Sequence, residues 1–327
     1  MNVPMLSTQA LSKVFKTRLA TKDGVVNKSV KAVTDVSIDI HTGETLALVG
    51  ESGCGKTTLG RLMGLFYKPT SGSISIKGEN TSSFTRRQLK PVRRDVQMIF
   101  QDPIAALNPR HTVETILTEP LNIYAVGKSA DRRQRALNLL DAVGLAATDF
   151  TRYPHEFSGG QRQRITIARA LTLQPDFIIA DEPVSALDVS VQSQILNLMK
   201  DLKDEFNLTY LFISHDLAVV HHLADRIAVM YLGRIVELAT RDSLFSNPGH
   251  PYSRALLRSV PKLQAGKGRL GKVLQGDPPS PIDPPAGCPF NPRCEHATDL
   301  CRVEVPLIKS HGSDTQHQIA CHNIGNF

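Results

Sequence analysis

The sequence predicts an α/β fold with a parallel central sheet, an inserted helical subdomain and a small cysteine-containing C-terminal extension. Short apolar runs typical of buried strands occur at 45–49, 177–180 and 211–213, and helical periodicity fills much of the chain between them. A glycine-rich turn follows the first run, as is typical where a parallel strand leads into a helix. After about residue 266 prolines and cysteines gather, which indicates a separate extension.

The elements predicted around this core follow the chain in order. Residues 6–40 are expected to form strands, with an exposed loop between Thr17 and Val30 because that stretch is polar and shows no period. The further predicted elements are a strand at 73–76, helices at 132–143, 161–173 and 191–206, and two strands around Gly233. We therefore expect one domain at 1–265, whose helical subdomain covers about 86–174, and an extension at 266–327.

Composition and charge limit the class of protein. Hydrophobic residues make up 41% of the chain and charged residues 21%, which is typical of a folded domain and not of a disordered one. The net charge of +7 does not distinguish among nucleic acid, anionic lipid and anionic ligands as partners. The basic run 86–94 lacks interleaved aromatic residues for base stacking, so it predicts a solvated or lipid-facing surface. Without a membrane-spanning apolar run or a secretory signal, we expect a cytosolic chain with peripheral membrane contact.

The turn after the first buried run has the pattern of a phosphate-binding loop. Residues 50–57 read Gly-Glu-Ser-Gly-Cys-Gly-Lys-Thr between a predicted strand and a predicted helix, which is the context that this motif requires. Glycines let backbone amides close around phosphate oxygens, and the helix N-terminus adds partial positive charge. Lys56 is expected to reach the β- and γ-phosphates of ATP, and Thr57 to ligate Mg²⁺. The nucleotide-binding candidates here are Gly50, Ser52, Gly53, Cys54, Gly55, Lys56, Thr57 and Thr58.

Two carboxylates follow the buried run at 177–180. Asp181 is expected to hold the Mg²⁺ shell. Glu182 is expected to lie beside the γ-phosphate and to accept a proton from the attacking water, or to orient it. Together with the loop at 50–57, this pair predicts a P-loop NTPase, a class that also contains recombinases, helicases and GTPases.

A third motif narrows the class. Residues 157–164 read Phe-Ser-Gly-Gly-Gln-Arg-Gln-Arg, in which small residues expose backbone amides at the start of a predicted helix as a second phosphate grip. This segment resembles the signature motif of ABC ATPases, although Phe157 replaces the usual leucine. The resemblance implies an ABC nucleotide-binding domain with an antiparallel β subdomain. It also implies that a partner subunit's ATP is bound by Ser158, Gly159, Gly160 and Gln161.

Four smaller elements fall in the order that this family shows. Gln101, in Phe-Gln-Asp-Pro, resembles the Q-loop glutamine that contacts the metal or the attacking water. Asp188, in Ser-Ala-Leu-Asp, resembles the D-loop residue at the dimer interface. His215, after the run at 211–213, resembles the switch histidine that binds the γ-phosphate. Phe15 resembles the aromatic residue that stacks on adenine, and a core position is the alternative for it.

More specifically, the whole chain resembles the ATP-binding subunits of dipeptide and oligopeptide importers, in particular the second ATPase of dipeptide permeases. The sequence segments that match this family lie at 50–56, 107–110, 153–158, 181–190 and 247–252. The resemblance implies ATP- and Mg²⁺-dependent import of dipeptides or oligopeptides, powered from the cytoplasmic face of the bacterial inner membrane. The implied partners are a related ATPase in a heterodimer, two transmembrane permease subunits and, indirectly, a periplasmic binding protein, but no nucleic acid.

Other readings stay open at this point. The same motor can serve an importer of glutathione, antimicrobial peptides or nickel, because this subunit does not contact the cargo. A soluble ABC ATPase of DNA repair or translation is the next alternative, but the chain shows neither long coiled coils nor a second cassette. A vestigial ATP site is disfavoured by the intact Lys56, Asp181 and Glu182.

The cysteines predict two kinds of site. Cys288, Cys294, Cys301 and Cys321 cluster near the C-terminus without the close Cys pairs of most zinc ribbons. Four thiolates suit a [4Fe–4S] cluster, which some members of the family carry, or Zn²⁺, and unliganded thiols or disulfides are the third alternative. Cys54 lies alone in the phosphate loop, where Lys56 and the helix N-terminus are expected to favour its thiolate, so alkylation should inhibit and ATP should protect.

Overall fold

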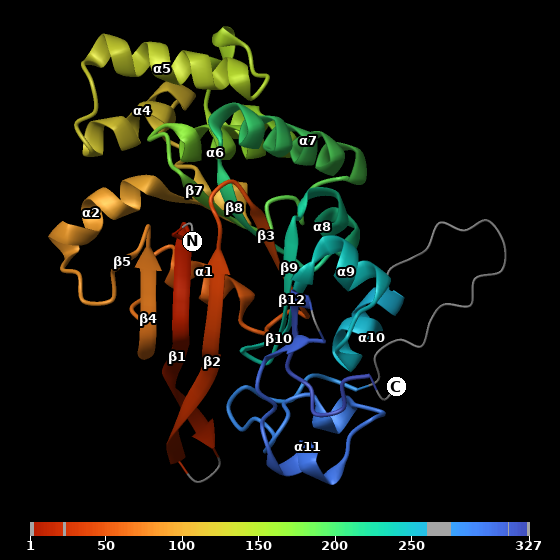
Figure 1. Cartoon of the computed structure of the whole chain (residues 1–327). Helices are drawn as coiled ribbons and strands as arrows, with labels where there is room; N and C mark the ends of the chain where they lie inside the picture. The colour runs from red at the N-terminus through yellow and green to blue at the C-terminus, as the bar shows by residue number, and fades with distance from the viewer. Residues whose placement is uncertain (1–2, 22–23, 260–275, 313, 326–327) are drawn as a thin grey trace.

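The protein is described by a computed structural model that covers residues 3–21, 24–259, 276–312 and 314–325. The described residues form a main sheet with the strand order β11-β12-β10-β9-β3-β8-β7-β6 (Figure 1). Strands β6 to β9 and β3 pair in parallel, and the strands beyond β9 pair in antiparallel fashion. The predicted parallel α/β core is therefore confirmed. The strands are β3 (Thr45–Val49), β6 (Val96–Ile99), β7 (Phe177–Asp181), β8 (Thr209–Ser214), β9 (Arg226–Tyr231), β10 (Arg234–Thr240), β11 (Lys309–His311) and β12 (Asp314–Ile319).

The central strands are buried because apolar groups cover both faces of the sheet. In β3, Ala47 and Val49 pack into one core, and Leu46 and Leu48 pack into the other. The first core contains side chains from α6 (Gly159–Leu171), α7 (Val189–Phe206) and α8 (Leu217–Leu223). The second contains side chains from α1 (Lys56–Met63) and from a second sheet. Burial on both faces explains why these strands read as continuous apolar runs.

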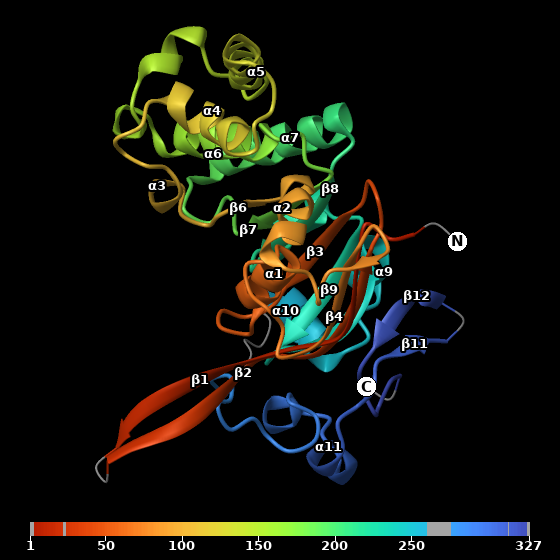
Figure 2. The same ribbon diagram turned by 90° about the vertical axis from the view of Figure 1, so that its left-hand side faces the viewer.

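The second sheet is antiparallel, with the order β2-β1-β4-β5. It comprises β1 (Leu6–Thr21), β2 (Gly24–Ile40), β4 (Ser71–Ile76) and β5 (Glu79–Asn80). The expected loop between Thr17 and Val30 is wrong, because β1 and β2 continue there as a paired hairpin that extends beyond the body of the molecule (Figure 2). Lys16 and Arg18 in this arm are exposed. A strand pair that covers no core needs no alternation of apolar residues, so its sequence shows no strand period.

The helical subdomain lies at one end of the main sheet (Figure 1). Its elements are α3 (Pro103–Ala106), α4 (Val113–Ile123), α5 (Ser129–Ala142), η1 (Ala147–Thr151), η2 (Pro154–Glu156) and α6. The expectation that helices dominate from Arg86 is wrong in one place, because β6 follows α2 (Arg86–Asp95) and pairs with β7 in the main sheet. A strand of only four residues between two helices leaves too short a pattern to show a period.

The C-terminal extension joins the main sheet through β12, which pairs with β10. Its other described elements are η3 (Asn291–Arg293), α11 (Asp299–Val303) and β11, and the helices before it are α9 (Arg241–Ser246) and α10 (Pro251–Ser259). Glu237 and His317 are both buried at this junction, with 2.7 Å between Glu237 Oε1 and His317 Nε2. The domain boundary predicted at 265/266 lies outside the described residues. No described helix combines the length and the apolar character needed to span a bilayer.

Candidate active site

The phosphate loop connects β3 to the start of α1, as the sequence predicts. Gly50 and Gly55 have φ angles of 154° and 109°. A Cβ at Gly50 would collide with the carbonyl of Met230, and a Cβ at Gly55 with the carbonyl of Ala32. Glycine is therefore required at both ends of the loop, because neighbouring backbone from β9 and β2 leaves no room for a side chain.

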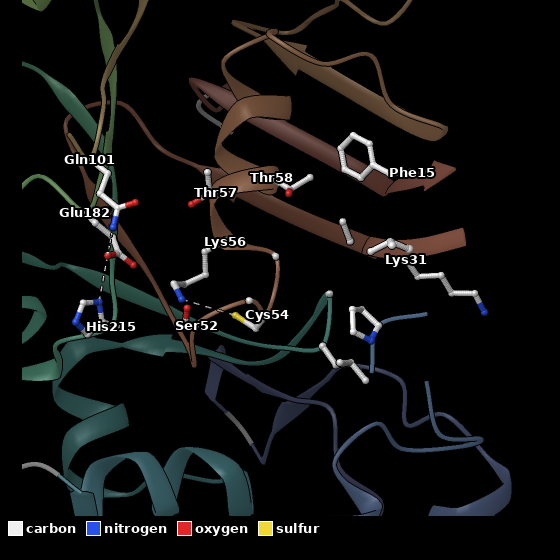
Figure 3. A pocket seen from close by; sticks show the side chains of 17 residues that line it. Phe15, Lys31, Ser52, Cys54, Lys56, Thr57, Thr58, Gln101, Glu182 and His215 are labelled. Carbon is white, nitrogen blue, oxygen red and sulfur yellow. Dashed lines mark hydrogen bonds and ion pairs between the residues drawn. The ribbon is translucent and has the colours of Figure 1, made fainter. Parts of the chain in front are cut away.

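The Lys56 side chain turns back onto this loop and ends beside Ser52 and Cys54 (Figure 3). Its Nζ donates to the carbonyl oxygens of Gly50 at 2.7 Å and Glu51 at 2.9 Å, and the residue is only 5% exposed. A buried ammonium is stable only with such acceptors. The loop thus holds a positive charge in the position that a bound anion would neutralise.

Thr57 and Asp181 form the candidate cation site. The Thr57 Oγ1 donates to Asp181 Oδ1 at 3.0 Å. Burial raises the pKa of the Asp181 carboxyl, and the hydrogen bond from Thr57 and the charges of Arg61 and Lys56 offset this only in part. A hydroxyl and a carboxylate are oxygen ligands of the type that Mg²⁺ prefers, so these residues fit the predicted ion.

Glu182 follows β7 in a strained backbone conformation, with a φ of 47°. Its Oε2 accepts a hydrogen bond from Gln101 Nε2 at 3.0 Å and lies 3.3 Å from His215 Nδ1 (Figure 3). Non-glycine residues in this region of φ cost about 1–3 kcal/mol and cluster at functional sites. The structure therefore brings together three residues that are far apart in the sequence and aims them at the phosphate loop.

The residues Lys56, Thr57, Gln101, Glu182 and His215 line one cavity of about 530 Å³, a size typical of small-ligand sites. Gly50 and Asp181 are not among its lining residues. Phe15 lies across the cavity from His215 (Figure 3) and contacts Tyr67 edge-on, with 5.6 Å between the ring centroids. This contact helps to hold the Phe15 ring in place at the cavity wall. The lining residues are Phe15, Val30, Lys31, Ala32, Ser52, Gly53, Cys54, Gly55, Lys56, Thr57, Thr58, Gln101, Glu182, His215, Leu232, Gly233 and Pro281.

The signature segment does not line this cavity. Ser158 caps α6 in a reciprocal pair with Gln161: its Oγ accepts from the Gln161 amide at 3.3 Å, and its own amide donates to Gln161 Oε1 at 3.0 Å. Ser158, Gly159 and Asp188 are exposed, whereas Gly160 and Gln161 are half-buried. The signature segment is therefore an exposed helix start that lies outside the lining of the nucleotide cavity described above.

The prediction that the thiolate of Cys54 is favoured is wrong. Burial raises the pKa of this thiol, and the opposing effect of Lys56, whose Nζ lies 3.9 Å from the sulfur, is smaller. Cys54 is 7% exposed because the loop folds over it. The sequence shows a nearby positive charge but not the desolvation that outweighs it.

The four C-terminal cysteines surround one small cavity in the extension. They line it together with His250, His296 and His322, and the Cys288 amide donates to the Cys301 carbonyl at 2.8 Å. Burial raises the pKa of Cys288 to about 11. In the part of the chain that the structure describes, no group of three or more His, Cys, Asp or Glu side chains is arranged to hold a metal ion. The thiols thus converge on a cavity but do not meet at a single point.

Several cavity and loop residues were not singled out from the sequence. Pro281, from the proline-rich segment, lines the nucleotide cavity, and its carbonyl accepts from the Lys31 amide at 3.0 Å. Arg293 contacts Glu51 of the phosphate loop. No local pattern marks either residue. The phrase 247–252, by contrast, contains Tyr252, whose hydroxyl accepts from the Glu51 amide at 2.9 Å.

Comparisons with known proteins place these features in a family. Residues 33–185 match the family described as ABC transporter, and residues 236–301 match the C-terminal region of oligopeptide/dipeptide transporters. The oligopeptide transport ATP-binding protein AppF of Bacillus subtilis is 53% identical over 90% of this chain and 89% of its own length. The dipeptide transport ATP-binding protein DppF of Haemophilus influenzae is 49% identical over 99% of this chain and 98% of its own length.

Solved structures agree on the fold. The dimeric post-hydrolysis state of the ATP-binding cassette MJ0796 bound to ADP and Pi is 30% identical, with a TM-score of 0.64 over 72% of this chain and 99% of that chain. The cbiO1 protein of Clostridium perfringens, part of the ABC transporter complex cbiONQ, is 25% identical, with a TM-score of 0.64 over 75% of this chain and 91% of that chain. The chain therefore belongs to the ABC transporter ATPases, as an ATP-binding subunit of the oligopeptide/dipeptide transporter type.

Proposed function

We propose that this ATPase powers the import of dipeptides or oligopeptides, with Glu182 as its catalytic base. The catalytic role of Glu182 is supported by one observation: Gln101 and His215 both contact its carboxylate. These three residues line the same cavity as Lys56. The carboxylate accepts a proton from the attacking water, and the two neighbours keep it aimed at the γ-phosphate.

The other cavity residues supply binding. The backbone amides of the phosphate loop and Lys56 hold the phosphates, and Phe15 stacks on the adenine. Thr57, Asp181 and Gln101 hold Mg²⁺, which neutralises charge on the phosphates when bound. The distance of 3.0 Å between the possible ligand atoms Thr57 Oγ1 and Asp181 Oδ1 supports this assignment.

The site is completed by a partner ATPase. Ser158 and Gly159 at the start of α6, and Asp188, are exposed and lie outside the lining of the nucleotide cavity described here. In the proposed dimer they close over the partner's ATP. The partner is a related ATPase, and the pair sits peripherally on the cytoplasmic face of the membrane beneath two permease subunits that a periplasmic binding protein supplies.

The proposed cargo, peptides, rests on the names of the relatives, which describe oligopeptide and dipeptide transport. The test is to purify the intact membrane complex and measure which ligand of its binding protein stimulates ATP turnover. Stimulation by dipeptides or oligopeptides supports the proposal. Stimulation by glutathione, nickel or an antimicrobial peptide alone would replace the cargo and leave the motor function in place.

We also propose that Cys288, Cys294, Cys301 and Cys321 hold a [4Fe–4S] cluster. A single zinc ion needs four ligands at about 2.3 Å from one point, whereas a four-iron cluster takes one thiolate at each iron and suits thiols spread around a cavity. The thiols line such a cavity. Iron and sulfide assays on anaerobically purified protein test this, and a colourless, iron-free preparation would refute it.

A further inference from the structure

An ion pair joins the cysteine-bearing extension to the phosphate loop. The guanidinium of Arg293 contacts both carboxylate oxygens of Glu51, at 2.7 and 3.0 Å. The Arg293 side chain is only 5% exposed and that of Glu51 26% exposed. Such a two-point contact fixes the geometry of both side chains, and a buried pair of this kind cannot lose one partner without leaving an unpaired charge.

Glu51 is the second residue of the phosphate loop and is held from three directions. Its amide donates to the Tyr252 hydroxyl, its carbonyl accepts from Lys56, and its carboxylate binds Arg293. The position of Glu51 therefore sets part of the backbone that surrounds the phosphates. Glu51 does not itself line the nucleotide cavity, but the next residue, Ser52, does, so the carboxylate brings a negative charge close to the site of a polyanionic ligand.

Arg293 is placed by the cysteine loop. It ends η3, directly before Cys294, and the preceding Phe290 packs edge-on against Tyr231 with 5.2 Å between ring centroids. Phe290 also contacts Tyr252, with 5.4 Å between centroids. The loop between Cys288 and Cys294 thus lies against Tyr252, whose hydroxyl accepts from the phosphate loop.

We propose that Arg293 is a positioning residue of the nucleotide site, which neutralises Glu51 and holds the phosphate loop open for ATP. The cysteine-bearing extension is then a structural part of the ATP site and not only an appendage. This inference rests on the nucleotide site proposed above. Without Arg293, the Glu51 carboxylate would repel the phosphates and the loop would lose one of its supports.

The test measures ATP binding and steady-state ATP hydrolysis in the purified transporter complex. Arg293→Gln should weaken ATP binding and raise the KM about tenfold, equal to about 1.4 kcal/mol, with kcat at saturating ATP nearly unchanged. Arg293→Lys, which keeps the charge but not the two-point contact, should show a smaller loss. Arg302→Gln removes an exposed arginine of the same extension and should bind ATP like the wild type.

The decisive variant removes both charges. If charge neutralisation is the role of Arg293, Glu51→Gln combined with Arg293→Gln should recover most of the lost affinity. A double variant that binds no better than Arg293→Gln, or an Arg293→Gln protein that binds like the wild type, would overturn the proposal. Should Arg293→Gln fail to fold, Arg293→Lys and the double variant carry the same comparison.

A further variant separates this inference from the proposed site. Lys56→Ala should abolish ATP binding whatever Arg293 does. Normal binding by Lys56→Ala would refute the nucleotide site itself. Loss of binding in Lys56→Ala with wild-type binding in Arg293→Gln would refute only the role of Arg293.

Discussion

At the scale of single residues, Glu182 combines a strained backbone with two side-chain contacts. Its φ of 47° turns the carboxylate toward Gln101 and His215, and its amide donates to the Ile213 carbonyl at 3.0 Å. These contacts hold the carboxylate in one conformation beside the phosphate loop. For the proton transfer proposed above, this arrangement would preorganise the site at Glu182.

Replacing Glu182 with glutamine should lower kcat for ATP hydrolysis by about 10²–10⁴-fold, because the amide cannot accept a proton. ATP affinity should change little, since the carboxylate acts on water and not on the nucleotide. Steady-state turnover and equilibrium ATP binding measure the two effects. Glu205→Gln, at an exposed position on α7, is the matched control. Turnover near the wild-type rate would exclude Glu182 as the base.

Cys54 should react slowly with alkylating agents at neutral pH, because burial raises the pKa of its thiol. The rate should rise steeply only in alkaline solution, as the thiolate forms. A pH series of maleimide labelling, followed by mass spectrometry of the peptide that contains Cys54, measures this. Cys54→Ala provides the blank, and rapid labelling of Cys54 at pH 7 would contradict the prediction.

At the scale of elements, the phosphate loop depends on backbone from two other strands. Gly55→Ala would place a methyl group against the Ala32 carbonyl at a φ of 109°. We expect a loss of about 1–3 kcal/mol in the free energy of unfolding and weak ATP binding, measured by denaturant titration and by nucleotide binding. Gly312→Ala, at a positive φ with open space around it, controls for strain alone and should leave ATP binding intact.

The elements that the sequence predicts well are those that bury an apolar pattern. β3, β7 and β8 are buried along their whole length, and α7 agrees with the predicted helix to within a few residues. The sequence analysis did not predict β6 or the outer part of the β1–β2 hairpin, for two different reasons. β6 is too short to show a period, and the hairpin arm covers no core that would require one.

At the scale of the whole molecule, the extension is joined to the main sheet through buried titratable groups. His250 is 1% exposed, and burial lowers its pKa to about 4. Burial alone would raise the pKa of Glu237, but hydrogen bonds from His317 and from the amides of Gly249 and His250 lower it overall. The neutral imidazole and the ionised carboxylate are therefore the forms compatible with the fold.

The free energy of unfolding should fall in acid. The folded state keeps His250 neutral, so its stabilisation is complete above pH 6.5 and is lost as the pH falls from 6.5 to about 4, by up to about 3 kcal/mol. The contribution of Glu237 is present above pH 4.5 and is lost below it. Thermal unfolding measured from pH 7.5 down to about pH 4 follows the loss of both contributions to stability.

The variant His250→Asn tests whether His250 causes the loss of stability between pH 6.5 and about 4. The His250 Nδ1 accepts from the Tyr252 amide at 3.0 Å, and an asparagine side chain can accept the same bond from an amide two residues ahead. We expect lower stability at pH 7.5, because the ring no longer fills its site, but a weaker dependence on pH between 6.5 and 4.5. An unchanged slope would assign the acid sensitivity to other groups.

The sequence by itself determined the family of this chain and predicted the residues of its nucleotide site. The loop at 50–57, Asp181 and Glu182 are marked by local patterns, because phosphate and metal binding require particular residues at fixed spacing. Only the tertiary structure decided how distant residues meet: that Gln101 and His215 converge on Glu182, that burial outweighs charge at Cys54, and that Arg293 holds Glu51. The physical reason is that desolvation and through-space contacts depend on which segments pack together, and no local spacing records that.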